Sequence, residues 1–354
     1  MEKNIVAIIG SAGIPCRYGG FETLAENLAN GLSDNFYVYV ACSSNYYNKS
    51  ERAIVYKHVK RVFTPIKPNG IQSIIYDVIS ILKVINKTRF LLILGSSAAF
   101  LVPLLRVLKP KVKIVYHPDG IEWQRGKWNI LAKLFLRWSS KTGAKHAHKI
   151  VVDNSALLPI YSKYATKLHE ISYGGNQYIP CQVTGQKNYW LTIARAEPEN
   201  NLDLIASCFA GIPNEKWVLV SNIATTAYGR KLSYKYKNFK NISFIDSEYR
   251  NHKLAELLGG CKGYIHGHSS GGTNPSLVSA MWGAPFIVCH NNPFNRSTTK
   301  NLAVYFTNEI NLAEIITSKG TQYKPQTMQI KLLAENEYSW KKITDKYQIL
   351  LESM

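Results

Sequence analysis

Short buried-strand runs alternate with helical segments from one end of this sequence to the other. A continuous β-branched or aliphatic run followed by an amphipathic helix is typical of a parallel strand that helices cover on both faces. The strands predicted in the first half are Ile5–Ile9, Tyr37–Ala41, Phe90–Leu94, Lys113–Tyr116 and Ile150–Val152. The predicted helices between them are Phe21–Leu32, Ile71–Ile85, Phe100–Leu108 and Lys127–His146.

The alternation stops between residues 173 and 186, where glycine, proline and polar residues indicate a linker. It then restarts, with strands predicted at Tyr189–Ile193, Trp217–Val220, Ile242–Ile245, Gly263–His266 and Phe286–Cys289. Helices are predicted at Asn201–Phe209, His252–Leu258, Pro275–Trp282, Leu312–Ser318 and, at the end of the chain, Ile330–Leu351. This pattern predicts an α/β protein with two doubly wound domains, at 1–178 and 187–329, and a C-terminal helical segment at 330–354.

Charge narrows the possible partners. The 354 residues hold 43 Lys and Arg against 23 Asp and Glu, a formal net charge of +20. Between Lys49 and Lys149 there are 20 basic and 4 acidic residues. Such a field attracts phosphate groups on nucleic acid, on anionic lipid or on a small ligand, although a merely soluble basic surface is the simpler reading.

Cysteine usage and the apolar segments indicate the compartment. The six cysteines are scattered without a CxxC pair, so neither a disulfide framework nor a structural zinc site is expected. The N-terminus reads as a buried strand rather than a signal peptide, and the longest apolar stretch, residues 90–105, is broken by Gly95-Ser96-Ser97. We expect a protein of the reducing cytosol.

The first strand leads into a glycine-rich turn, Gly10 to Thr23, that fits neither GxGxxG nor GxxxxGK[ST]. Gly19 and Gly20 stand directly before a predicted helix, where backbone N–H groups can approach an anion, and Arg17 adds a positive charge. The alternative is a turn that only joins strand to helix.

A second segment, His117 to Trp128, follows a strand and gathers two carboxylates, a histidine, an arginine and two tryptophans. Asp119 is a candidate general base or orienting group for a hydroxyl. The alternative is that Asp119 and Glu122 are turn and N-cap residues before the next helix.

That next helix carries a basic residue every four positions, at Lys133, Arg137, Lys141 and Lys145. This spacing places them along one ridge. Apolar side chains remain for the core or an interface: Trp128, Leu131, Leu134, Phe135 and Trp138. A basic amphipathic helix with tryptophans can lie against anionic lipid, but a solvated charged face is the commoner case.

In the second half, Arg195 follows a strand and could pair with a phosphate, unless it forms a surface ion pair with Glu197 or Glu199. A later strand leads into the loop His266 to Asn274, with Asn274 as candidate N-cap and Pro275 as first helical residue. His266 and His268 share a strand face but have no third ligand nearby, so no metal is expected.

Together these motifs resemble the GT-B glycosyltransferases of the retaining GT4 type, and most closely their bacterial polysaccharide branch with rhamnosyltransferases and a DUF1972-type N-terminal domain. The matching segments are Gly13–Pro15, Arg17–Thr23, Asp119-Gly120, Glu122-Trp123, Lys127-Trp128, Pro198–Asn201, His266–His268, Gly271–Leu277 and Asn292–Arg296. The resemblance implies two Rossmann-like domains that face a central cleft, with the final helix crossing back onto the N-terminal domain.

The resemblance also implies the site residues. The donor side would comprise Arg17, Gly19, Gly20, Arg195, His268, Ser270, Gly271, Gly272, Thr273, Asn274 and Ser279. The acceptor side would comprise Tyr18, Glu22, Glu122, Trp123 and Arg125, and the catalytic groups would be His117, Asp119 and Arg195. Three positions depart from the wider family pattern. Gly271 and Ser279 stand in place of two glutamates, the first of which the related branch commonly lacks as well and the second of which usually holds the nucleotide ribose. Asn200 replaces a lysine that often accompanies the diphosphate arginine.

The activity implied is transfer of a hexose or deoxyhexose, with rhamnose favoured, in surface polysaccharide biosynthesis such as that of a capsule. The donor would be a nucleotide-diphosphate sugar (dTDP-rhamnose or a UDP-hexose) and the acceptor a polyprenyl-diphosphate-linked glycan. The reaction would retain configuration and need no metal or other cofactor. The protein would bind peripherally to an anionic membrane, on the inner face of the plasma membrane. No nucleic-acid partner is expected. A basic nucleic-acid-binding protein and a degenerate, non-catalytic GT-B partner in a polysaccharide assembly complex are the alternatives.

Overall fold

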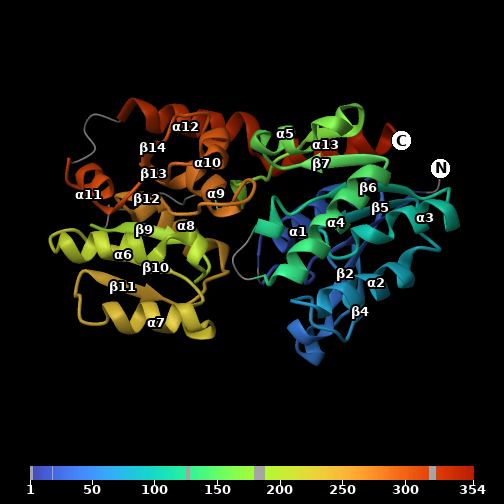
Figure 1. The fold of residues 1–354 in the computed structure, drawn as a ribbon, viewed down its shortest axis with the longest axis horizontal. Coiled ribbons are helices and arrows are strands. Elements are labelled where there is room, and N and C mark those ends of the chain that lie inside the picture. The colour runs from blue at the N-terminus through green and yellow to red at the C-terminus, as the bar shows by residue number, and fades with distance from the viewer. Residues whose placement is uncertain (1–2, 18, 125–127, 179–187, 319–323) are drawn as a thin grey trace. The chain divides into compact units, whose positions relative to one another are not determined.

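The computed structural model describes residues 3–17, 19–124, 128–178, 188–318 and 324–354. The chain divides into two compact units, which are described separately below (Figure 1). The first unit comprises residues 1–173 and 340–354, and the second comprises residues 174–339. The divisions therefore fall after Tyr173 and after Ser339, whereas the sequence analysis placed them at 178–187 and at 330.

In its described part, the first unit holds an eight-stranded sheet with the order β3-β4-β2-β1-β5-β6-β7-β8. The pairings are parallel except that of β3 with β4, which is antiparallel. The strands are β1 Ile5–Ile9, β2 Tyr37–Ser43, β3 Val55–Tyr56, β4 Val59–Thr64, β5 Phe90–Leu94, β6 Lys113–His117, β7 Lys149–Val152 and β8 Leu168–Glu170.

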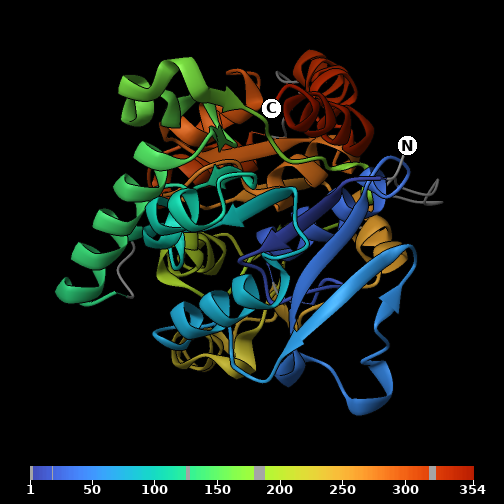
Figure 2. The same cartoon turned by 90° about the vertical axis from the view of Figure 1, so that its right-hand side faces the viewer.

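Helices cover both faces of this sheet. They are α1 Gly20–Leu32, α2 Gln72–Val84, α3 Val102–Leu108, α4 Ile130–His146, α5 Leu158–Tyr161 and α13 Trp340–Glu352. Alternate strand residues such as Val6, Ile8 and Val38 form one core with α1 and α13. On the opposite face, Tyr116 of β6 donates a hydrogen bond to Ser140 of α4. Figure 2 shows α4, green in the colour scale, and α13, red, on opposite sides of the strands.

The second unit holds, among its described residues, a six-stranded parallel sheet with the order β11-β10-β9-β12-β13-β14. Its strands are β9 Trp190–Ile193, β10 Trp217–Val220, β11 Ile242–Ile245, β12 Gly263–His266, β13 Ile287–His290 and β14 Val304–Phe306. Its helices are α6 Leu202–Gly211, α7 Ala227–Tyr236, α8 Asn251–Gly260, α9 Pro275–Gly283, α10 Pro293–Thr299, α11 Glu309–Thr317 and α12 Lys324–Glu337. One core packs around α6 and α11, and another around α8, α9 and α12.

Every predicted strand is present, and the α/β class is confirmed. Three features differ from the prediction. The strands β3, β4, β8 and β14 and the helices α5, α7 and α10 were not predicted. Among them β3, β8, β14 and α5 span only two to four residues, and runs this short carry little periodicity. The final helix is two helices, of which α12 lies in the second unit and α13 in the first. Helix α4 begins at Ile130 rather than at Lys127.

No helix in the described ranges is both long and apolar enough to cross a membrane.

Candidate functional site

Each unit has one topological switch point, the place in a doubly wound sheet where the strand order reverses direction. In the first unit it lies between β1 and β5, and in the second between β9 and β12. Ligands of such sheets bind beyond the carboxyl ends of the strands at this point, because the loops there diverge to opposite faces. Most of the site residues predicted from the sequence lie in loops at these carboxyl edges.

In the second unit, Arg195 follows β9 at the switch point, and its side chain is 31% exposed. Its Nη1 lies 3.5 Å from Oε1 of Glu197, so the ion pair considered as an alternative is present in this structure. A partly exposed pair of this kind is worth at most about 1 kcal/mol. A phosphate that binds Arg195 would therefore displace Glu197 at a small cost in free energy.

Asn200 ties the two loops of this switch point together. Its Nδ2 donates to the carbonyl of Arg195 at 2.8 Å, and its Oδ1 lies 2.8 Å from Nδ1 of His268. Because the amide oxygen can only accept, Nδ1 of His268 carries the proton. Asn200, where the resemblance implied a lysine, thus joins the loops of Arg195 and His268 by neutral hydrogen bonds.

The loop from Gly267 to Asn274 is fixed from several sides. Ser269 donates through both its N–H and its Oγ to the carbonyl of Glu199, each at 2.9 Å. The side-chain amides of Asn292 and Asn295, at the start of α10, both donate to the carbonyl of His268 at 2.9 Å. A loop restrained in this way presents its backbone groups in one geometry.

The helix after this loop starts as predicted. Oδ1 of Asn274 accepts from N–H of Ser276 at 3.0 Å, and Pro275 occupies the first turn of α9. Thr273 is buried and lies 3.5 Å, oxygen to oxygen, from Thr298, while Ser270 and Gly272 are half-buried. The helix start adds backbone N–H groups and the positive end of a dipole to the switch point.

Ser279 lies on the buried side of α9, where it is 2% exposed. Its Oγ accepts a hydrogen bond from Nε2 of Gln177 at 3.1 Å. Gln177 stands just after the first residues of the second unit, and the sequence analysis assigned it only to a linker. A separation of 102 residues leaves no local signal for this contact.

Two further histidines stand at the ends of β12 and β13. Burial, with the neighbouring His268 and His290, lowers the pKa of His266 well below its usual value, and burial lowers that of His290. In the residues that the structure covers, no group of three or more His, Cys, Asp or Glu side chains could hold a metal ion.

In the first unit, the turn after β1 is held by carboxylates. Glu22, buried on α1, accepts from N–H of Ala12 at 2.6 Å, and Glu26 accepts from N–H of Cys16 at 2.8 Å. Glu22 was predicted on the acceptor side, and this contact gives it a role within the turn. The two carboxylates occupy N–H groups that the turn could otherwise offer to an anion.

Arg17, predicted on the donor side, forms a bidentate ion pair with Glu51 and also donates to the carbonyl of Tyr46. The hydrogen bond to Glu51 raises the pKa of Arg17 and lowers that of Glu51. Gly19 is the N-cap of α1 and has no side-chain cap, and Gly20 is the first helical residue. Tyr18, beside them, lies outside the described residues.

His117 ends β6 and is 2% exposed. Burial lowers its pKa to about 4, so the ring is neutral at pH 7. Its Nδ1 lies 3.1 Å from the carbonyl of Pro118, which can only accept, so Nδ1 carries the proton. Nε2, the unprotonated nitrogen, is a buried acceptor with no hydrogen-bond partner among the described residues.

Asp119 is partly buried, two residues beyond β6, and Glu122 and Trp123 lie in the 3₁₀ turn Glu122–Gln124. The N-cap of α4 is Asn129, whose side chain accepts from N–H of Ala132. The alternative that Asp119 or Glu122 caps this helix is therefore wrong. Arg125 lies outside the described residues.

The sequence analysis missed Asp77, a buried carboxyl group on α2. Ser97, in the loop after β5, donates to its Oδ2, while its Oδ1 is buried without a partner in the structure. Burial raises the pKa of Asp77 to about 7. Its place beside the loop after β5 puts a titrating group near the first switch point.

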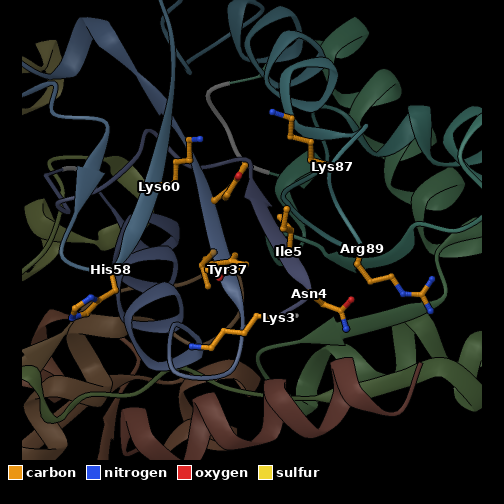
Figure 3. A pocket seen from close by; sticks show the side chains of 10 residues that line it. Lys3, Asn4, Ile5, Tyr37, His58, Lys60, Lys87 and Arg89 are labelled. Atoms are coloured by element: carbon orange, nitrogen blue, oxygen red, sulfur yellow. The ribbon is translucent and has the colours of Figure 1, made fainter. Parts of the chain in front are cut away.

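A hollow of about 540 Å³ opens at the other edge of this sheet, where the strands begin (Figure 3). Its basic lining residues are Lys3, His58, Lys60, Lys87 and Arg89. Lys3 donates to the carbonyl of Ser33 and Arg89 to that of Lys111. None of the predicted site residues lines it.

Comparison with known proteins agrees with this architecture. Residues 3–176 match the model of a family described as "Domain of unknown function (DUF1972)", as the resemblance predicted for the N-terminal domain. No curated protein matches the chain.

Solved structures match along the whole chain. Sucrose-phosphate synthase from Thermosynechococcus elongatus has a TM-score of 0.84 at 11% identity, covering 99% of each chain. Anabaena HepE, solved in complex with UDP and glucose, has a TM-score of 0.74 at 13% identity, covering 100% of each chain. The catalytic domain of starch synthase IV from Arabidopsis thaliana, solved with ADP and acarbose, has a TM-score of 0.71 at 9% identity, covering 100% of this chain and 99% of that one. The chain has the predicted GT-B fold.

Proposed function

We propose that this protein is a glycosyltransferase that takes a sugar from a nucleotide-diphosphate donor bound at the switch point of its second unit. The observation that carries the proposal is the convergence, at that point, of Arg195, the restrained loop Gly267–Asn274 and the start of α9. A guanidinium, backbone N–H groups and a helix N-terminus are the groups that stabilise a diphosphate.

The same groups supply the chemistry. As the bond between sugar and diphosphate breaks, negative charge grows on the leaving diphosphate, and preorganised donors stabilise that charge more than they stabilise the ground state. Arg195 is the only full positive charge we assign to this task. The hydrogen bonds of Asn200 hold Arg195 and His268 in position without adding charge.

The ribose is assigned to the Ser279 side of the site, as the resemblance implies. Here Gln177 and Ser279 form a neutral hydrogen-bonded pair at the position of the usual carboxylate. An amide and a hydroxyl both accept and donate, so this pair can bond ribose hydroxyls, although more weakly than a carboxylate would.

We assign the acceptor to the first unit. His117 offers a neutral Nε2 to an acceptor hydroxyl, and Asp119 is the candidate orienting or basic group. The basic charge of this half suits an acceptor that carries a diphosphate, such as a lipid-linked glycan. Rhamnose or another hexose as the transferred sugar, retention of configuration and independence of metals are part of this proposal.

One alternative function has an observation in its favour. Ser279, and with it Asn200, replaces a charged residue of the family pattern, which is what a non-catalytic GT-B partner would show. Such a protein would keep its fold and lose donor turnover.

The test is a turnover assay with a panel of dTDP-, UDP-, GDP- and ADP-sugars, in which release of the nucleoside diphosphate is measured with and without lipid extract as acceptor. We expect release from one donor class, increased by the extract. Donor binding without any release would support the non-catalytic partner, and neither binding nor release would refute the proposal.

A further inference from the structure

Helix α4 turns its large apolar side chains to solvent. The exposed ones are Ile130 at 74%, Leu131 at 73%, Leu134 at 59% and Trp138 at 54%. They lie between the start and the middle of the helix, and the exposed basic residues Arg137, Lys141 and Lys145 lie from its middle to its end. Steps of three or four along a helix align Ile130, Leu134, Trp138, Lys141 and Lys145 roughly on one ridge.

Apart from Leu136, the buried side of α4 consists of small residues: Ser139, Ser140, Gly143 and Ala144. Ser139 donates to the carbonyl of Ser96 and accepts from N–H of Phe100 at 3.0 Å. An ordinary surface helix buries its large apolar residues and exposes its polar ones. In α4 the arrangement is reversed, so the packing of its own unit does not explain the exposed side chains.

Helix α3 extends this apolar surface, since it packs beside α4. Its exposed residues include Leu104 at 53%, Val107 at 77% and Leu108 at 61%. Arg106 of α3 donates to the carbonyl of His146, at the end of α4. Near the start of α3, the ring of Phe100 stacks on Trp138 at a centroid distance of 6.1 Å. The two helices therefore form one continuous surface, the α3–α4 surface.

This surface is strongly positive. Neither α3 nor α4 contains an acidic residue. At their joined ends, Arg106, Lys145 and Lys167 stand close enough to help burial lower the pKa of His146. Like charges gathered on one side repel one another, and an anionic partner relieves that repulsion.

We propose that the α3–α4 surface docks on an anionic lipid bilayer. Apolar side chains at the start of α4 would enter the boundary between headgroups and acyl chains, and Arg137, Lys141 and Lys145 would meet lipid phosphates. Trp138 stands between these two regions, at the depth that tryptophan favours in a membrane interface. Figure 2 shows the N-terminal half of α4 projecting away from the strands, as entry into a flat surface requires.

Charge complementarity favours an anionic bilayer, rather than a second copy of the chain, as the partner of the α3–α4 surface, because two such positive surfaces would repel each other. The inference does not rest on the proposed enzymatic activity, since membrane binding needs no nucleotide sugar. It places the protein at the anionic face of a membrane, where a lipid-linked acceptor would be presented.

The test is co-sedimentation of the full chain with vesicles of phosphatidylcholine mixed with phosphatidylglycerol, and with vesicles of phosphatidylcholine alone. We expect salt-sensitive binding to the mixed vesicles only. Leu131→Ser with Leu134→Ser should weaken binding about tenfold or more, because two exposed apolar side chains are lost from the interface. Lys141→Gln with Lys145→Gln should weaken it about fivefold for each charge removed.

Matched controls come from the second unit. Ile310 and Tyr234 are exposed at 69% and 73%, and their replacement by serine should leave vesicle binding unchanged. Lys231→Gln with Lys240→Gln removes the same charge from exposed sites of the second unit. Quenching of Trp138 fluorescence by brominated lipid, measured as the difference between the parent and Trp138→Phe, reports insertion without altering Leu131 or Leu134.

Three results would overturn the proposal. The first is equally poor binding of the parent to mixed and neutral vesicles at low salt. The second is a leucine variant that binds as well as the parent, with no quenching of Trp138. The third is a parent that sediments as a dimer and a leucine variant that sediments as a monomer, which would mean that a second copy covers the surface.

Discussion

The two switch points have the same kind of close contact between a glycine and a backbone carbonyl, and they differ in the charge of the side chains that hold their loops. In each, a glycine lets the chain pass close to a carbonyl oxygen: a Cβ on Gly10 would lie 1.8 Å from the oxygen of Leu94, and one on Gly267 would lie 2.2 Å from that of Asn200. In the first unit, Glu22 and Glu26 accept hydrogen bonds from N–H groups of the turn, and Glu51 forms an ion pair with Arg17.

In the second unit, the side chains that hold the loops of the switch point are mostly neutral. Asn200, Asn292 and Asn295 hold the loops by hydrogen bonds, and an ion pair joins Arg195 to Glu197. A loop held by carboxylates repels an anion, and a loop held by amides does not. The comparison teaches that a shared backbone turn does not fix the ligand, and it supports the proposal that the diphosphate binds in the second unit.

The largest effect is expected from adding a methyl group at these two glycines. Gly10→Ala should lower the free energy of unfolding by more than about 3 kcal/mol, since φ is +98° and the new Cβ would overlap a carbonyl oxygen. Gly267→Ala should cost about 1–3 kcal/mol. Denaturant unfolding measures both.

The control for these two variants is Gly211→Ala, at the end of α6, where a Cβ would meet nothing within 4 Å. It should be neutral or slightly stabilising. If Gly10→Ala proved as harmless as Gly211→Ala, the close approach described for the first switch point would be absent.

The second prediction concerns pH and the first unit. Burial raises the pKa of Asp77 from 3.8 to about 7, so the folded state binds this proton more tightly than the unfolded state does. The associated stability is fully present below about pH 4 and is lost as the pH rises towards 7. The free energy of unfolding of Asp77→Asn, relative to that of the parent, should therefore increase by about 2–3 kcal/mol as the pH rises from 5 to 8.

Thermal unfolding across this pH range measures the difference. The contribution of His117 has the opposite sign, because its lowered pKa makes stability rise between about pH 4 and 6.5. Both the parent and Asp77→Asn carry His117, so this contribution cancels in the difference between them. Asp203→Asn, which replaces an exposed carboxylate in the second unit, is the control. Parallel pH profiles for the parent and Asp77→Asn would show that Asp77 is ionised in the folded protein.

The third prediction sharpens the assignment of the diphosphate. Arg195→Ala should weaken binding of the nucleotide sugar by roughly 1.5–3 kcal/mol, the range for a hydrogen bond to a charged group. Arg250→Ala is the matched control, because this arginine of the second unit also pairs with a glutamate, Glu248, and lies outside the site. Calorimetric titration gives both affinities. An equal loss of affinity in the two variants would show that Arg195 does not contact the diphosphate.

The smallest effect is expected at the ribose position. Ser279→Glu should strengthen donor binding by about 1 kcal/mol, since a carboxylate accepts two ribose hydrogen bonds better than a hydroxyl does. Gln177 would remain as a donor to the new side chain. An affinity no better than the parent's would mean that the nucleotide lies elsewhere.

The sequence was sufficient for the parallel sheets and the principal helices, because strand and helix periodicities are local. It also located the N-cap of α9 at Asn274. It could not show that Asn200 joins Arg195 to His268, or that Gln177 meets Ser279, since these contacts depend on how distant segments pack. Nor could it decide which side of α4 faces solvent.

The most direct test of the central claim is a thermal-shift comparison of nucleosides, nucleoside diphosphates and nucleotide-diphosphate sugars with the full chain. If the second switch point holds a diphosphate, one nucleotide series should raise the melting temperature for its diphosphate and its sugar, and not for its nucleoside. A nucleoside that stabilises the protein as much as its diphosphate, or no shift in any series, would contradict the account.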